Sequence, residues 1–249
     1  MTGIAGFELS QLLLVSAVVV LAALLRGFTG FGFALVAVPV FALIMPPTEA
    51  VVLSALLTLT ISLGGIRSYW GVVPVKPMWP LVLMALVGTV VGTWVITMIS
   101  ASVFQFWAGL SVILACAGMA CFRPLKRPLH PGFAWLTGLL SGLMNGALAI
   151  PGPPMIIYAM LQEPQPHRSR ALLMTFFLAA SLLALASFAV AGFFSWRSAG
   201  YFLASLPALY AGDRIGSYLF HHFGSALYRR IALAGLLAMG ASIVIRALL

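Results

Sequence analysis

The amino-acid sequence predicts an all-α, polytopic helical membrane protein. Of its 249 residues, 63% are hydrophobic and only 7% are charged, whereas soluble globular chains carry about 25% charged residues. Apolar runs of roughly 20 residues, the length that crosses a bilayer as a helix, follow one another along the whole chain. Strand-like alternation is absent, which argues against a transmembrane barrel. We therefore expect one transmembrane domain over residues 1–249, with about eight to ten membrane segments.

The first half of the chain contains five apolar runs separated by Gly, Pro and charged residues. Thr48 is the expected N-cap of the third run, and Glu49 follows in its first turn, where a carboxylate is favourable. The segments are expected at about Leu9–Leu25, Ala34–Met45, Thr48–Ile66, Met78–Ile99 and Ser102–Cys121.

The second half follows the same order. Its first part, Trp135 to Leu161, is interrupted by Pro151-Gly-Pro-Pro154 and is short for two full crossings. It therefore either crosses twice or forms a re-entrant pair of half-helices that meet near the midplane. The expected segments are Trp135–Ala149, a short run to Leu161, Ala171–Gly192, Ala199–Leu219 and a last span that ends near Leu249.

The two halves share a pattern of glycine and proline. The stretch from Gly27 to Pro39 has the same length as the stretch from Gly142 to Pro154, and Gly88-x-x-x-Gly92 matches Gly212-x-x-x-Gly216. We expect an internal duplication, with one repeat over about residues 9–122 and the other over about residues 132–249. Glycines four residues apart let helix backbones approach closely, and packing is the simplest interpretation of the Gly-x-x-x-Gly pairs.

The distribution of positive charge predicts the orientation. Lys and Arg concentrate in cytoplasmic loops of membrane proteins, and the loop from Arg123 to His130 is the most positive in this chain. If that loop is cytoplasmic, then Arg67–Lys76 and Gln162–Arg170 are cytoplasmic too, whereas Pro46-Pro47 is external. Equivalent loops then lie on opposite faces, so the two repeats are expected to be inverted.

The glycine-rich interruption after the first span is the strongest candidate for a site. Irregular backbone is tolerated at membrane depth only where it is buried in protein or lines a cavity. Two interrupted segments in matching positions indicate the substrate site of a repeat-built transporter. Free backbone N–H groups and a helix N-terminus suit an anion, although helix packing alone is the alternative. The candidate substrate-binding residues are Arg26, Gly27, Thr29, Gly30 and Gly32 from the first half and Asn145, Gly146, Gly152 and Pro153 from the second.

Arg26 is a candidate because a charge within an apolar span is costly and therefore functional by default. The chain has a formal charge of +9, and its only acids are Glu8, Glu49, Glu163 and Asp213. Of these, Asp213 is the one candidate partner for Arg26. A transported anion and water at the mouth of a cavity are the other candidates.

Other classes of function find little support. In a soluble protein the positive charge would suggest nucleic acid, but here it lies mainly in loops and at helix ends, so no nucleic-acid partner is expected. His221-His222 lacks the companions of a metal site, and Cys116 and Cys121 are expected to be packing residues. The sequence offers no cluster of nucleophile and base. We expect neither an enzyme nor a metal nor a cofactor.

Taken together, these motifs resemble the sulfite exporter TauE/SafE family over nearly the whole chain. The resemblance is carried by Gly27-Phe-Thr-Gly-Phe-Gly-Phe, Val38-Pro39, Pro47-x-x-Ala50, the two Gly-x-x-x-Gly pairs, Gly142 through Pro154, and Tyr228-Arg229-Arg230. Asp213-Arg214 departs from the family, which more often has an apolar pair there.

The resemblance implies a multi-pass transporter of the bacterial inner membrane. Its substrate would be a small sulfur-containing or organic anion such as sulfite or a sulfonate, with export as the expected direction. A coupled proton or other ion is a further candidate partner, beside the lipid bilayer itself. An anion channel is the nearest alternative, and an intramembrane enzyme is a more distant one.

Overall fold

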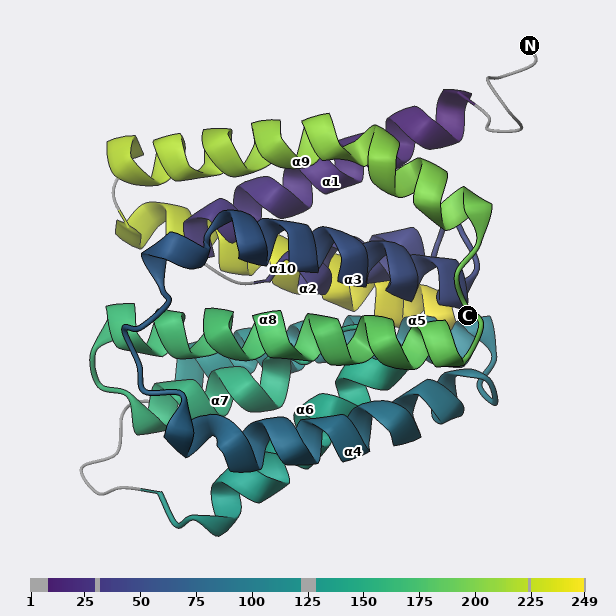
Figure 1. The fold of residues 1–249 in the computed structure, drawn as a ribbon. Helices are drawn as coiled ribbons and strands as arrows, with labels where there is room; N and C mark the ends of the chain where they lie inside the picture. The colour runs from purple at the N-terminus through teal and green to yellow at the C-terminus, as the bar shows by residue number, and fades with distance from the viewer. Residues whose placement is uncertain (1–8, 30–31, 122–128, 224, 249) are drawn as a thin grey trace.

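The computed structural model describes residues 9–29, 32–121, 129–223 and 225–248, and all regular structure in them is helical. The predicted fold class is therefore confirmed. Figure 1 shows the helices lying roughly along one common direction. The helices are α1 (Leu9–Thr29), α2 (Phe33–Phe41), α3 (Pro47–Gly64), α4 (Trp79–Ile96), α5 (Ala101–Cys121), α6 (Gly132–Leu148), α7 (Gly152–Gln162), α8 (Pro166–Val190), α9 (Trp196–Phe223) and α10 (Ser225–Leu248), with 3₁₀ turns at Ile66–Ser68 and Lys76–Met78.

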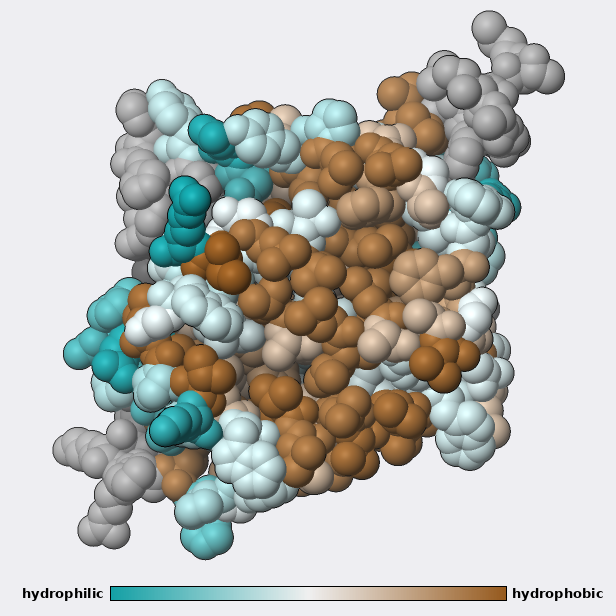
Figure 2. All heavy atoms as spheres, in the orientation of Figure 1, coloured by the Kyte–Doolittle hydropathy of each residue, from teal (hydrophilic) through white to brown (hydrophobic). Residues whose placement is uncertain are grey.

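Five helices within the described residues are long and apolar enough to cross a membrane by length and composition: α1, α3, α4, α5 and α8. Figure 2 shows apolar side chains across the centre of one face and hydrophilic ones mainly toward its ends. On α4, for example, Leu86, Val90 and Trp94 are exposed. A contiguous apolar surface of this kind suits contact with lipid.

Helices α2 and α7 are too short to span a bilayer. At 1.5 Å per residue, their 9 and 11 residues extend only about 14 and 16 Å, whereas the hydrocarbon core is about 30 Å thick. Each follows a longer helix after an interruption of the helical structure, α2 after α1 and α7 after α6. Each half of the chain therefore contains a long helix followed by a half-length one.

Several predicted boundaries were wrong. Helix α2 ends at Phe41 rather than Met45, and α8 begins at Pro166 rather than Ala171. Helix α1 does not end near Leu25 but continues through Arg26 and Gly27 to Thr29, because a single glycine weakens a helix without breaking it. Helix α3 is not capped by Thr48: Pro46 is its N-cap and Pro47 its first residue. Proline is well suited to that position because its missing N–H would have no intrahelical partner there.

Three pairs of helices make the most extensive contacts: α4 with α6, α1 with α9, and α5 with α10. Helices α3 and α8 pack on each other and run in opposite directions through the centre of Figure 1. Helix α3 also contacts α9, and α8 contacts α4. If each helix is exchanged with the one five positions away in the order, α4–α6 becomes α9–α1 and α3–α9 becomes α8–α4, whereas α5–α10 and α3–α8 are mapped onto themselves.

Glycines bring the backbones of α4 and α6 together. A Cβ on Gly88 or Gly92 of α4 would overlap backbone atoms of α6, and one on Gly138, Gly142 or Gly146 of α6 would overlap backbone atoms of α4. In the pair formed by α1 and α9, a Cβ on Gly212 or Gly216 would likewise meet backbone atoms of Val20 or Leu24. The interpretation of the Gly-x-x-x-Gly pairs as packing motifs is confirmed.

The described loops divide between two ends of the bundle in Figure 1. The α3–α4 connection, with Arg67 and Lys76, lies at the same end as the α7–α8 connection. The α2–α3, α4–α5 and α8–α9 connections lie at the opposite end. Most of the loop from Arg123 to His130, on which the predicted orientation was based, falls outside the described residues, so the sidedness stays a prediction.

Candidate functional site

A cavity of about 30 Å³ lies where the two broken segments meet. One wall comes from the end of α1 and the start of α2, and a second from the turn that joins α6 to α7. Helices α3 and α8 close the remaining sides. The lining residues are Arg26, Gly32, Phe33, Ala34, Thr58, Ser62, Ile150, Pro151, Gly152, Met174 and Phe177.

Gly32 lies where the first half of the chain contributes to the cavity wall. It is the N-cap of α2 with φ 102°, in the left-handed region, where a side chain would clash with the backbone and glycine is favoured. Its carbonyl oxygen accepts a hydrogen bond from the Val36 N–H at 3.3 Å. Gly32, Phe33 and Ala34 all line the cavity, so the N-terminus of α2 points at it.

The break between α6 and α7 supplies the opposite wall. Ala149 ends α6 in the left-handed conformation, with φ 53°. The Ala149 N–H donates to the backbone carbonyl oxygen of Asn145 at 2.8 Å, and the Ile150 N–H donates to that of Met144 at 3.4 Å. This is the usual way for a helix to satisfy its last carbonyls. Pro151 and Gly152 then start α7 and line the cavity. Two helix N-termini thus meet there, and both favour negative charge.

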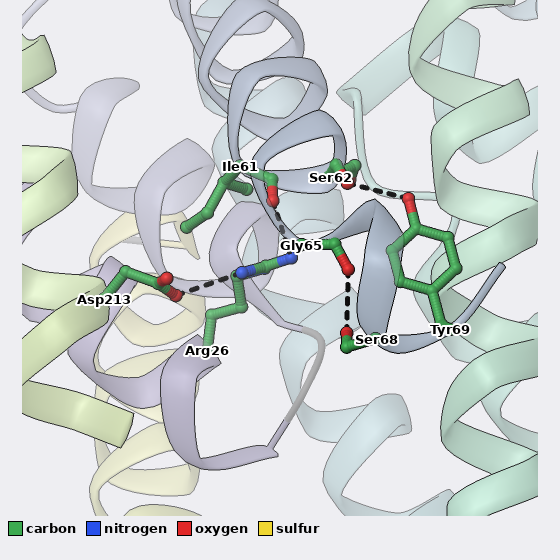
Figure 3. A network of polar contacts seen from close by, with 7 residues as sticks. All are labelled: Arg26, Ile61, Ser62, Gly65, Ser68, Tyr69 and Asp213. Carbon is green, nitrogen blue, oxygen red and sulfur yellow. Dashed lines mark hydrogen bonds and ion pairs between the residues drawn. The ribbon is translucent and has the colours of Figure 1, made fainter. Parts of the chain in front are cut away.

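The guanidinium of Arg26 adds one whole positive charge to the partial charges of the two helix N-termini (Figure 3). Its Nη1 donates to Asp213 Oδ1 at 3.0 Å, and its Nη2 donates to the Ile61 carbonyl oxygen at 3.1 Å. The side chain of Arg26 is only 9% exposed, whereas that of Asp213 is 36% exposed. Asp213 reaches Arg26 because α9 packs along α1. The buried guanidinium is therefore paired, and it also forms part of the cavity wall.

The wall from α3 carries two hydroxyl groups one turn apart, on Thr58 and Ser62. Thr58 Oγ1 is buried and has no hydrogen-bond partner in the described part of the chain. The Ser62 carbonyl oxygen accepts a hydrogen bond from the Tyr69 hydroxyl at 2.7 Å. Burial raises the pKa of Tyr69, an effect that the nearby Arg26 charge partly offsets. Tyr69 thereby ties the α3–α4 connection to the end of α3 beside Arg26.

Three of the candidate residues chosen from the sequence, Arg26, Gly32 and Gly152, come together in this cavity. Gly27 is buried in α1, and Pro153 is buried in the first turn of α7; neither is among the lining residues. Thr29 is the last residue of α1. Its side chain and the whole of Gly30 lie outside the described residues.

Asn145 and Gly146 lie in the contact of α6 with its neighbours. Asn145 Nδ2 donates to Thr89 Oγ1 at 3.2 Å and to the Ala180 carbonyl oxygen at 2.8 Å, which links α6 to α4 and α8. Gly146 packs against the Thr89 backbone. Both residues thus hold α6 in the position from which its C-terminal end reaches the cavity.

The lining residues on α3 and α8, namely Thr58, Ser62, Met174 and Phe177, were missed as site residues. Hydroxyl groups at four-residue spacing within an apolar run were a usable signal for Thr58 and Ser62. Met174 and Phe177 resemble any other apolar residue of a span, so only the packing of α8 identifies them.

One family model, described as sulfite exporter TauE/SafE, matches residues 15–243 of the chain. The match covers nearly the whole sequence. No curated protein matches the chain. No solved structure matches it either.

Proposed function

Because the chain belongs to the sulfite exporter TauE/SafE family, we propose that it is a secondary transporter of a small sulfur-containing or organic anion. The family implies a membrane transporter of sulfite-type anions, and the apolar helices make the protein a multi-pass membrane protein. The finer parts of the proposal are that sulfite or a sulfonate is the substrate, that the direction is export, and that the membrane is the bacterial inner membrane. The protein performs no chemical conversion in this proposal.

The observation that carries the proposal is the composition of the cavity wall. The N-termini of α2 and α7 and the guanidinium of Arg26 meet at one cavity, and all three favour an anion. The hydroxyl of Thr58, which has no partner among the described residues, adds a hydrogen-bond donor. We propose this cavity as the anion site, with Arg26, Thr58, Gly32 and Gly152 in contact with the anion.

The size of the cavity supports a site that opens during transport. A volume of about 30 Å³ has room for about two water molecules. Sulfite has one sulfur and three oxygen atoms, so we propose that the walls move apart to admit it. The structure then corresponds to a closed state, in which Met174 and Phe177 of α8 face the site.

The repeats offer a physical route for that movement. We propose that residues 9–122 and 132–249 form two inverted repeats that rock against each other around the cavity. The packing of α1 on α9 corresponds to the packing of α6 on α4 when the two halves of the chain are exchanged, and this correspondence supports the arrangement. So does the presence of one half-length helix in each half.

Ligand-dependent thermal stability tests the proposed substrate class. Purified protein is heated with sulfite, thiosulfate, sulfonates or carboxylates, with chloride at matched ionic strength as the control. A ligand that binds the folded state must raise its stability, so at least one oxyanion is expected to raise the melting temperature more than chloride does. If none does, the proposed substrate class is wrong.

Flux through reconstituted vesicles separates a transporter from the second candidate, an anion channel. A transporter saturates with substrate concentration, because each cycle requires a conformational change. Flux that rises linearly with concentration and needs no coupled ion would favour the channel.

A further inference from the structure

We propose that Asp213 is an internal competitor of the transported anion. Its carboxylate occupies Arg26 while the cavity is empty and is displaced from Arg26 when an anion enters. This inference rests on the proposed function, because it concerns the same cavity. It assigns to Asp213 the role of setting the affinity of the site.

The geometry places the two partners differently. Arg26 is part of the cavity wall, whereas Asp213 is not among the lining residues. Arg26 and Asp213 are joined by a single hydrogen bond, from Nη1 to Oδ1 at 3.0 Å. A guanidinium has five N–H donors and commonly holds an oxyanion through two parallel bonds. An anion in the cavity therefore approaches Arg26 from the cavity side, where Asp213 does not lie. It can make the bidentate contact with the guanidinium that Asp213 does not make.

Arg26 and Asp213 differ in burial, so separation of the pair has different consequences for the two side chains. With 9% of its side chain exposed, Arg26 regains little hydration if it loses its partner, so replacement of Asp213 by another negative charge is favoured over an unpaired cation. Asp213, at 36% exposed, is the less enclosed partner and loses less when the pair separates. Exchange of one anion for another on Arg26 keeps the buried cation paired throughout.

The other charged groups near the pair favour the same movement. Arg170 on α8 attracts Asp213 and repels Arg26, so it offers the released carboxylate a second cation. Arg214, next to Asp213 on α9, is exposed and lies over the Tyr210 ring at 4.9 Å. On the far side of Arg26, Tyr69 is neutral while its hydroxyl donates to Ser62, so it does not compete as an anion.

The test is the affinity of Asp213→Asn for sulfite, measured by titrated thermal shift. Loss of the competing carboxylate is expected to tighten sulfite binding about fivefold, the factor that corresponds to one half-exposed ion pair. Glu163→Gln is the matched control. It removes the same unit of charge, but its partner is Arg168, at 3.1 Å, and it is not among the residues that line the cavity. Its sulfite affinity is expected to equal that of the wild type.

If Asp213→Asn binds sulfite no more tightly than the wild type and Glu163→Gln do, the competition is overturned. If both variants bind more tightly by the same factor, general electrostatics explains the gain and the inference again fails. The double variant Arg26→Gln/Asp213→Asn is expected to lose the gain, because there is then no guanidinium to free.

A structure of the wild-type protein with sulfite provides a second test that needs no variant. We expect sulfite on Arg26 and the Asp213 carboxylate out of hydrogen-bond range of Nη1. An intact bond between Arg26 and Asp213 with sulfite in the cavity would overturn the inference and leave the proposed function standing. Sulfite located elsewhere, or no anion bound by either the wild type or Asp213→Asn, would instead refute the proposed site, and the inference with it.

Discussion

Gly32 and Gly152 line the same cavity, although one is the N-cap of α2 in the first half of the chain and the other is the first residue of α7 in the second. Their meeting places the N-termini of the two half-length helices on either side of one small space. Since helix N-termini attract negative charge, this relationship turns two separate breaks in the backbone into a single candidate anion site. The predictions that follow test the parts of that site and of the frame around it.

Arg26 is expected to act through its charge. Arg26→Gln removes the cation from the cavity wall and should weaken anion binding by about tenfold or more, the range expected for hydrogen bonds to a charged group. Arg26→Lys keeps the charge without the planar fork, so it should retain part of the affinity. Titrated thermal shifts measure both, at matched expression and starting melting temperature. Normal binding by Arg26→Gln would mean that backbone and hydroxyl groups alone form the site.

Thr58→Val should stabilise the protein and weaken anion binding together. The valine has nearly the same shape and removes a buried hydroxyl that has no partner among the described residues. The free energy of unfolding is expected to rise by about 1 kcal/mol. Thr60→Val is the matched control, because the Thr60 hydroxyl is already bonded to the Leu56 oxygen at 2.9 Å and Thr60 does not line the cavity. Unchanged anion affinity in Thr58→Val would remove Thr58 from the site.

Gly32→Ala should destabilise the start of α2. At φ 102° an alanine is strained by about 1–2 kcal/mol, so the melting temperature should fall and the cavity wall should shift. Gly64→Ala serves as the control, because Gly64 lies at the end of α3 with nothing within 4 Å of the added methyl group. Equal melting temperatures for the two variants would contradict the left-handed geometry at Gly32.

Gly146→Ala should loosen the contact between α4 and α6. The new methyl group would overlap the Thr89 carbonyl oxygen, and overpacking of this kind typically destabilises a protein by about 1–3 kcal/mol. Gly235→Ala on α10, where no atom lies within 4 Å of the added methyl group, should leave the melting temperature unchanged or raise it. Tolerance of Gly146→Ala would argue against close packing of the two backbones.

The orientation can be tested with single cysteines in a background without Cys116 and Cys121. Ser68→Cys and Gln165→Cys lie at the positively charged end of the bundle, in the α3–α4 and α7–α8 connections. A membrane-impermeant maleimide should label them only from the cytoplasmic side. Ser100→Cys, in the α4–α5 connection, should be labelled only from outside. Labelling of all three from one side would rule out the proposed arrangement of inverted repeats.

The sequence by itself determined the class of the protein and the positions of its breaks. Composition and the length of the apolar runs are enough to predict helices in a bilayer, because the membrane leaves few other ways to satisfy the backbone. Gly32 and Pro151-Gly152 interrupt the helices through their own backbone preferences, which act locally and can be recognised in the chain. Arg26 was identified because a charge in an apolar run is costly wherever the chain folds.

Only the tertiary structure decided which side chains meet. That Asp213 pairs with Arg26 depends on α9 packing along α1, and that Thr58 and Ser62 face the cavity depends on the rotation of α3 about its axis. Asn145 and Gly146 precede Gly152 by only seven and six residues in the sequence, yet they pack against α4. Successive residues of a helix point in different directions, so the contacts of each one are set by the neighbouring helices, which the local sequence does not specify.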